Sequence, residues 1–173
     1  MVHFDFDYTL YKTAETVLIW SPRGDSIYDG RTCFRLSPSL FAHYEKADDE
    51  IVDETSFVNF FSIDFAAAKP IVPVVEIFNL TKNKKILSAR PQEAASDFYN
   101  YMGNDAEFIG LKNSSAASKL EFILNFDNPL VFEDSPVVIN TLIENGIDCV
   151  LVSSENDNQT TLTYNIASRK LSP

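Results

Sequence analysis

The clearest fold signal in the chain is the segment LVFEDSPVVINTLIENGIDCVLV, residues 130–152. Its first apolar run, Leu130 to Phe132, predicts a short buried strand, and the run from Cys149 to Val152 predicts a second one. Between them, a Ser-Pro pair and apolar residues at helical spacing predict a helix from Pro136 to Asn145. A strand, a helix and a strand in succession are typical of two parallel strands joined by a crossover helix.

The same alternation extends toward the N-terminus. The segment Met1 to Asp7 predicts a first strand that ends in acidic residues. Further on, the pattern predicts helices over Pro73–Leu80, Pro91–Met102 and Ser114–Phe126, strands over Lys84–Ser88 and Glu107–Gly110, and a final strand or loose tail around Thr160 to Asn165. We therefore expect an α/β fold, with a doubly wound, Rossmann-like and mostly parallel sheet. In such sheets ligands bind beyond the carboxyl ends of the strands.

The segment between the first strand and this regular region differs in composition. Two aromatic or β-branched runs, Thr16 to Trp20 and Ile27 to Leu36, flank a Pro/Gly turn and predict a β-hairpin. A short helix is expected from Ser37 to about Ala47. We expect residues 1–173 to form a single domain, with a hairpin or at most a small cap inserted at about 14–65.

Composition narrows the classes of function. The 173 residues carry 14 Lys+Arg and 25 Asp+Glu, a formal charge of −11, which argues against non-specific binding to duplex nucleic acid. A small phosphorylated substrate remains compatible with this charge, because a metal ion can reverse the field inside a cleft. Cys33 and Cys149 are expected to be packing residues. The chain shows neither a signal peptide nor a membrane-length apolar run, so a cytoplasmic protein with no membrane partner is expected.

Reactive residue types stand where three predicted strands end. The first strand leads into Asp5-Phe6-Asp7-Tyr8-Thr9, the second into Ser88-Ala89-Arg90, and the third into Glu133-Asp134, while Lys119 lies early in the preceding helix. Carboxylates from two strand ends that meet at one sheet edge make a site for a hard divalent cation, and Mg²⁺ is the usual occupant.

These residues resemble the four motifs of the haloacid dehalogenase (HAD) superfamily. The D-x-D-x-T at 5–9, the apolar strand that ends in Ser88, the upstream Lys119 and the pair Glu133-Asp134 occur in the family's order, over residues 1 to about 152. The resemblance implies a Mg²⁺-dependent phosphatase that acts on a phosphomonoester.

The resemblance also implies a role for each residue. Asp5 would attack phosphorus and form an aspartyl-phosphate, and Asp7 would act as acid and base. Thr9 and Ser88 would hydrogen-bond the phosphoryl oxygens, and Lys119 would neutralise their charge. The implied Mg²⁺ ligands are Asp5, Asp7 through its carbonyl, Asp134 and Glu133.

A closer similarity is to polynucleotide phosphatase-type HAD domains, in which a Lys-bearing helix precedes an acidic pair. It implies a nucleotide or a polynucleotide end as substrate, although Ser135 stands where those relatives often have Arg. Arg90 either contacts the substrate or pairs with a surface carboxylate, and Lys112 is the alternative to Lys119. Aromatic residues of the insertion, Trp20 and Tyr28 among them, are candidates for a small roof over an open site.

Two other functions compete with the phosphatase. A receiver-like signalling module also combines an acidic cluster with Ser/Thr and Lys, but its acceptor Asp belongs at the end of the third strand, where Gly110 stands here. A catalytically silent binding or scaffold protein would keep the fold alone. His3, expected to point outward, and His43 are expected to be structural.

Overall fold

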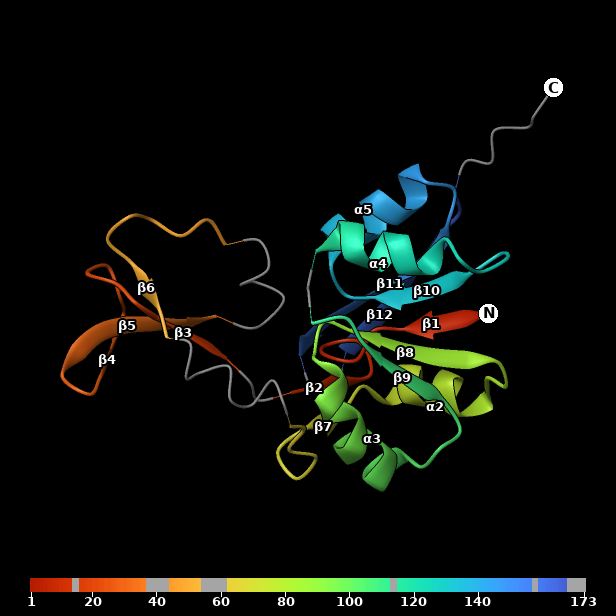
Figure 1. Ribbon diagram of the computed structural model, residues 1–173, viewed down its shortest axis with the longest axis horizontal. Coiled ribbons are helices and arrows are strands. Elements are labelled where there is room, and N and C mark those ends of the chain that lie inside the picture. Colours follow the sequence, from red (N-terminus) through yellow and green to blue (C-terminus); the bar gives the residue numbers. More distant parts are fainter. Residues whose placement is uncertain (14–15, 37–43, 54–61, 113–114, 157–158, 168–173) are drawn as a thin grey trace.

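The computed structural model describes residues 1–13, 16–36, 44–53, 62–112, 115–156 and 159–167 (Figure 1). A six-stranded sheet forms its centre, in the order β12-β11-β10-β1-β8-β9. The strands are β1 (Val2–Phe4), β8 (Lys84–Ser88), β9 (Glu107–Gly110), β10 (Leu130–Glu133), β11 (Asp148–Asn156) and β12 (Gln159–Asn165). All neighbouring strands pair in parallel except β11 and β12, which are antiparallel. The prediction of a mixed α/β fold with a mostly parallel sheet is confirmed, and so is the final strand.

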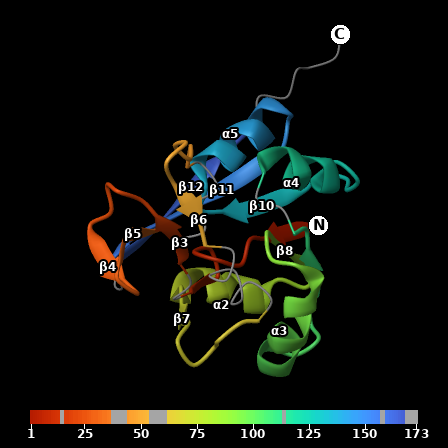
Figure 2. The ribbon, with the colours of Figure 1, turned by 60° about the vertical axis from the view of Figure 1, so that its left-hand side comes forward.

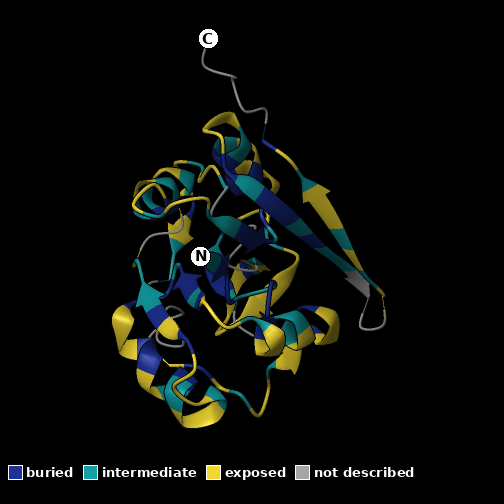
Figure 3. Ribbon diagram, turned by 90° about the vertical axis from the view of Figure 1, so that its right-hand side faces the viewer, coloured by how far each residue is buried: buried dark blue, intermediate teal, exposed yellow. Residues whose placement is uncertain are grey.

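Helices cover both faces of this sheet. They are α2 (Val72–Leu80), α3 (Ala95–Met102), α4 (Ala116–Ile123) and α5 (Pro136–Glu144), with a short 3-10 helix η2 (Gln92–Ala94) before α3. Residues alternate between the two faces along each strand, so Phe132 packs with Val74 of α2, whereas its neighbour Val131 packs with Leu142 of α5. Figure 3 shows the buried residues gathered in the central strands. A sheet covered on both faces explains the uninterrupted apolar runs of residues 130–132 in β10 and 86–87 in β8.

The parallel register brings the carboxyl ends of the central strands to one edge. Phe4 pairs with Phe132 of β10 on one side and with Ile86 of β8 on the other. The residues that follow β1 and β10 therefore emerge side by side. Ser115 and Ser135 cap the two helices beside them, each accepting a backbone N–H through its hydroxyl.

The insertion contains more structure than the expected hairpin. Its strands β3 (Val17–Trp20), β4 (Ser26–Tyr28), β5 (Arg31–Leu36) and β6 (Ile51–Val52) form a second sheet in the order β4-β5-β3-β6. The tight turn lies at Asp29-Gly30 and joins β4 to β5, whereas residues 21–25 link β3 and β4, which are not neighbours. The expected turn position was wrong, because β5 pairs with β3 and β4 at once.

The second sheet lies beyond the carboxyl edge of the main sheet, and Figure 2 shows it from another side. A two-stranded ribbon of β2 (Tyr11–Lys12) and β7 (Lys69–Pro70) stands where the chain leaves and re-enters the main body. None of the helices in the described residues is long and apolar enough to cross a membrane.

Two further expectations differ from the structure. The helix expected from Ser37 falls largely outside the described residues, as does His43, and described residues 44–47 are not helical. The expectation that His3 points outward was wrong. Its ring is fully buried against Phe122 and Phe126, because the sheet face that it occupies is covered by α4 and the turn that follows.

Candidate functional site

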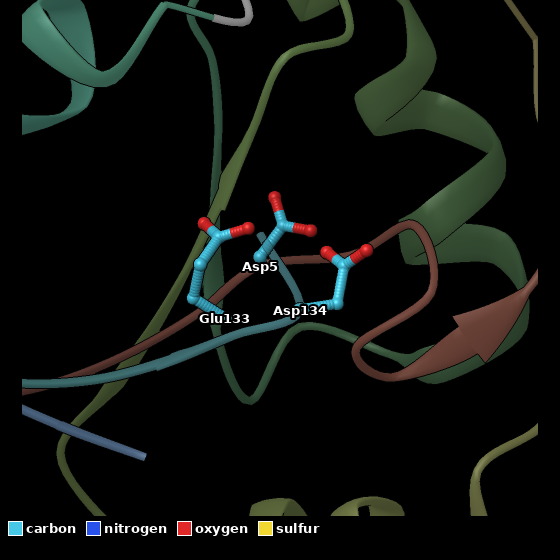
Figure 4. A group of neighbouring side chains, drawn as sticks. All are labelled: Asp5, Glu133 and Asp134. Atoms are coloured by element: carbon cyan, nitrogen blue, oxygen red, sulfur yellow. The ribbon is translucent and has the colours of Figure 1, made fainter. Parts of the chain in front are cut away.

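Three carboxylates converge at the carboxyl edge of the main sheet. Asp5 directly follows β1, Glu133 ends β10, and Asp134 follows it. Figure 4 shows the three side chains directed toward one another. One oxygen from each lies within 4.8 Å of the others, a spacing that a single cation could bridge. Asp5 and Glu133 are buried, and Asp134 is partly buried.

Lys119 supplies the positive charge of this cluster. It lies in the first turn of α4, and its Nζ is 2.7 Å from Asp5 Oδ1 and 2.6 Å from Glu133 Oε2. These two ion pairs are buried. With all four groups ionised, three carboxylates and one ammonium sum to −2, so one divalent cation would bring the charge of the cluster to zero.

Burial determines how the cluster holds its protons. It raises the pKa of Asp5 to about 7, against the opposing effect of the Lys119 ammonium. It also raises the pKa of Asp134 well above its ordinary value, helped by the negative charge of Glu133. Burial by itself lowers the pKa of Lys119, but the charges of Asp5 and Glu133 outweigh it and raise that pKa above its ordinary value. Lys119 therefore stays charged, and protons and a metal ion compete for the carboxylates.

A tight turn after β1 brings Thr9 to the cluster. Tyr8 adopts the left-handed region with φ 61°, which is strained for an aromatic residue. The backbone N–H groups of Leu10 and Tyr11 then donate to the carbonyl of Phe6 and close the turn. The buried Thr9 hydroxyl consequently lies 3.4 Å from both Asp5 Oδ2 and Asp134 Oδ1.

Asp7 faces a different partner. Its carboxylate accepts hydrogen bonds from Arg90 Nη2 at 2.7 Å and Nε at 2.9 Å, and from the Thr13 hydroxyl at 2.7 Å. The Arg90 side chain is 0% exposed, and its Nη1 donates to the carbonyl of Ser62. Arg90 was expected either to contact substrate or to pair with a surface carboxylate. It pairs with a carboxylate, but with that of Asp7 at the site itself, and contact with substrate stays a prediction.

The other predicted residues lie around this centre. Ser88 ends β8 and is fully buried, and its hydroxyl accepts the backbone N–H of Arg90 at 3.1 Å. Lys119 is the lysine that contacts the carboxylates, whereas Lys112 precedes α4 and its backbone N–H donates to the carbonyl of Arg90. Ser135 caps α5, and its N–H donates to Glu133 Oε1 at 3.1 Å.

Thr13 is the residue of this network that sequence reasoning missed. Thr13 directly follows the short strand β2, and its hydroxyl donates to Asp7, six positions earlier in the chain. No motif marks it, because a threonine beside a strand is common and its partner is determined by the turn between them.

The donor set suits a hard divalent cation. Carboxylate oxygens are the ligands that Mg²⁺ prefers, and Asp5, Asp134 and Glu133 offer such oxygens together in a partly enclosed cluster with a net negative charge. Glu133 also accepts from Lys119 and from the N–H of Ser135, so both of its oxygens already have a hydrogen-bond partner. The residues present thus fit the metal that the sequence predicted.

Comparison of this chain with family models, with curated proteins and with solved structures finds no match in any of the three.

Proposed function

We propose that this chain is a Mg²⁺-dependent phosphohydrolase of the HAD type that acts on phosphomonoesters through an aspartyl-phosphate at Asp5. The observation that carries the proposal is the buried Lys119 ammonium shared by Asp5 and Glu133 within a three-carboxylate cluster. If the charges of the cluster only had to balance one another, one carboxylate would be enough for the single ammonium of Lys119. The excess of negative charge favours binding of a metal cation, and the cation and Lys119 together favour binding of a negatively charged phosphoryl group.

The topology supports the same site. From β1 the chain builds the sheet outward through β8 and β9, then returns to β10 and builds outward through β11. We interpret this order as a doubly wound sheet whose strand order reverses between β1 and β10. Ligands in such sheets bind at that reversal, and Asp5 and Glu133 follow these two strands.

In the proposed reaction, a carboxylate oxygen of Asp5 attacks phosphorus. The bond from phosphorus to the ester oxygen breaks, and the alcohol leaves with a proton that Asp7 donates. Water then gives a proton back to Asp7 and attacks the aspartyl-phosphate, which regenerates the Asp5 carboxylate and releases inorganic phosphate. Lys119 and the Thr9 hydroxyl oppose the charge on the transferring group. Bound Mg²⁺ would supply further charge neutralisation and would orient the phosphoryl oxygens.

A second candidate is a phospho-acceptor module that forms the aspartyl-phosphate and releases it slowly. One observation favours it: Asp7, the expected acid and base, is held by Arg90 and Thr13. Turnover by the phosphatase requires Asp7 to reach the leaving oxygen or the attacking water, and the ion pair with Arg90 opposes that movement. The two candidates share the first half of the reaction and differ in the second.

The experiment compares an aryl phosphate with an alkyl phosphate, with and without Mg²⁺. An aryl leaving group departs with little protonation, whereas an alkyl one needs an acid. We expect Mg²⁺-dependent turnover of both esters, loss of both in Asp5→Asn, and a larger loss for the alkyl ester than for the aryl ester in Asp7→Asn. Asp97→Asn, on α3, is the matched control and should retain turnover.

Each outcome has a defined meaning. Stoichiometric phosphorylation of Asp5 from an acyl phosphate without steady-state turnover would favour the acceptor module. Turnover that persists in Asp5→Asn, or in excess chelator, would contradict both candidates.

A further inference from the structure

One face of the second sheet combines aromatic rings with arginines. In antiparallel strands, directly paired residues share a face, and so do residues two apart in one strand. Trp20 pairs with Cys33 and with Ile51, and Tyr28 pairs with Arg31. The face that carries Trp20, Tyr28, Arg31, Cys33, Arg35 and Ile51 is called here the Arg–aromatic face.

The two rings on this face are stacked, with Tyr28 exposed and Trp20 half-buried. Trp20 and Tyr28 lie with ring centroids 6.0 Å apart and planes at 29°, and Cys33, which is 1% exposed, lies on the strand between them. Arg31 lies over the Trp20 ring at 4.3 Å, and Arg35 lies 5.3 Å from the centre of the Tyr28 ring. Tyr28 is 53% exposed and Ile51 59% exposed, although burying them would be favourable.

The acidic segment 44–50 of the insertion lies next to the opposite face of this sheet, whereas Asp29 follows Tyr28 in the β4–β5 turn and Asp53 follows β6 on the same face as Ile51. Phe34 faces away from the Arg–aromatic face, because it pairs with Ile19, and Tyr44 packs against it. Tyr44 and the N–H of Ala47 donate to Glu50, and these hydrogen bonds lower the pKa of Glu50 to about 2. Glu50 therefore anchors the acidic segment 44–50 next to the opposite face.

The two arginines of the Arg–aromatic face keep their charge available. Arg23 is neutralised by Asp49 and Glu50. Within the described residues, by contrast, neither Arg31 nor Arg35 forms a salt bridge, and Arg35 donates instead to the Thr16 hydroxyl. In a chain with a net charge of −11, two such arginines beside stacked rings favour an anionic partner with flat faces.

We propose that the Arg–aromatic face binds single-stranded nucleic acid, whose bases stack on Tyr28 and Trp20 while its phosphates meet Arg31 and Arg35. Unpaired bases expose the flat faces that such a surface needs, whereas a duplex hides them. The second sheet lies beyond the carboxyl edge where Asp5 stands. A strand held there can present a terminal phosphate to Asp5, a consequence that rests on the proposed function.

Binding is tested with strands that carry no terminal phosphate, so that the carboxylate cluster contributes nothing. Trp20 is the single tryptophan of the chain, and a base that stacks beside it should quench its fluorescence. The probes are oligo(dT) and oligo(rU) of about 12 nucleotides and a duplex of equal length. We expect saturable quenching by single strands, and little by the duplex. The two single strands show whether the sugar is distinguished.

Variants locate the surface. Tyr28→Leu should weaken single-strand binding about tenfold, the loss of one stacked base. Arg31→Gln with Arg35→Gln should weaken it and reduce the slope of log K against log salt by about 1.4, the equivalent of two phosphates. The matched control is Tyr164→Leu on β12, because Tyr164 is 55% exposed, close to the exposure of Tyr28, and lies in the other sheet.

The outcomes separate this inference from the proposed function. If the protein hydrolyses aryl phosphate but single strands do not quench Trp20 fluorescence, the proposed binding of single strands is wrong and the proposed function stands. Unchanged single-strand binding in Tyr28→Leu would also show that the Arg–aromatic face is not the binding surface. A chain that binds single strands and hydrolyses no phosphate ester overturns the proposed function and leaves the binding face. If both hold, Tyr28→Leu should raise KM for a 3′-phosphorylated strand by a larger factor than it raises KM for an aryl phosphate.

Discussion

Replacing Lys119 by Met tests the electrostatics of the carboxylate cluster most directly. The substitution keeps the apolar stem and removes the ammonium that lies 2.7 Å from Asp5 and 2.6 Å from Glu133. With all groups ionised, the charge of the cluster then changes from −2 to −3. Both ion pairs are buried, so little water is available to take the place of the lost cation.

The magnitude follows from the burial of both partners. Removal of one member of a buried ion pair costs about 3–5 kcal/mol, because the remaining charge is left uncompensated. For a chain of this size, each kcal/mol lowers the unfolding midpoint by roughly 2–4 °C. We therefore expect Lys119→Met to unfold about 6–20 °C below wild type at pH 8 in the presence of a chelator.

The assay is thermal unfolding with and without Mg²⁺, and Lys84→Met is the control. Lys84 is also buried, but it donates to the carbonyl of Phe78 and lies over that ring rather than beside a carboxylate. Mg²⁺ should raise the midpoint of Lys119→Met more than that of wild type, because the cation meets a larger negative charge. Lys84→Met should respond to Mg²⁺ as wild type does.

Two results would refute this reasoning. One is a Lys119→Met protein as stable as wild type in chelator, which would mean that the cluster is not an electrostatic unit. The other is an equal response to Mg²⁺ in Lys119→Met and Lys84→Met, which would place the cation elsewhere.

Three further predictions concern other parts of the molecule. Arg90→Gln should lower the free energy of unfolding by about 3–5 kcal/mol, because it leaves Asp7 without its buried cation. A double-mutant cycle with Asp7→Asn, measured by urea unfolding, should give a coupling energy above about 1 kcal/mol. Additive losses would show that the two side chains do not interact. Burial lowers the pKa of His3 from 6.5 to about 4, so the unfolded chain binds the proton more readily. The stability contribution of His3 is thus full above pH 6.5 and falls by about 3 kcal/mol as pH drops toward 4. His3→Leu should show a correspondingly flatter pH profile of unfolding free energy, and identical profiles would exclude His3 as the cause. Gly110→Ala should lower the free energy of unfolding by about 1–3 kcal/mol, because its Cβ would lie 2.4 Å from the backbone of Pro91 and Gln92. A chemical-unfolding midpoint equal to that of wild type would show that the backbone moves to relieve this clash.

Much of the main sheet was predictable because its signals are local. A strand such as Leu130–Glu133 is an apolar run, and the helix after it begins at a Ser-Pro pair and ends near a glycine. These signals depend on backbone hydrogen bonding and on the spacing of side chains within a few residues. The meeting of Asp5 with Glu133 also followed, since neighbouring parallel strands end at one edge.

The second sheet was predicted only in part. The apolar runs of β3 and β5 were recognised, but which strand lies between which neighbours depends on pairing partners that local sequence leaves open. One signal was available and was not used: Asp29-Gly30 is a strong hairpin turn, with φ 49° and 71° at its two residues. The burial of His3 was missed for a similar reason, because its environment comes from α4 and the following turn, more than a hundred residues away.

The order of strands and helices, and the carboxylates that follow the strands, can be recognised in the chain alone, because both depend on periodicities over a few residues. The partners of those carboxylates, by contrast, depend on the fold. Asp5 shares a buried ammonium with Glu133, 128 positions further on, whereas Asp7, two residues from Asp5, belongs to Arg90. Coulomb energies depend on separation through space and on burial, and neither quantity is encoded at a single position. For that reason the positions of the charged residues could be predicted from the sequence, whereas their ion-pair partners could be identified only from the structure.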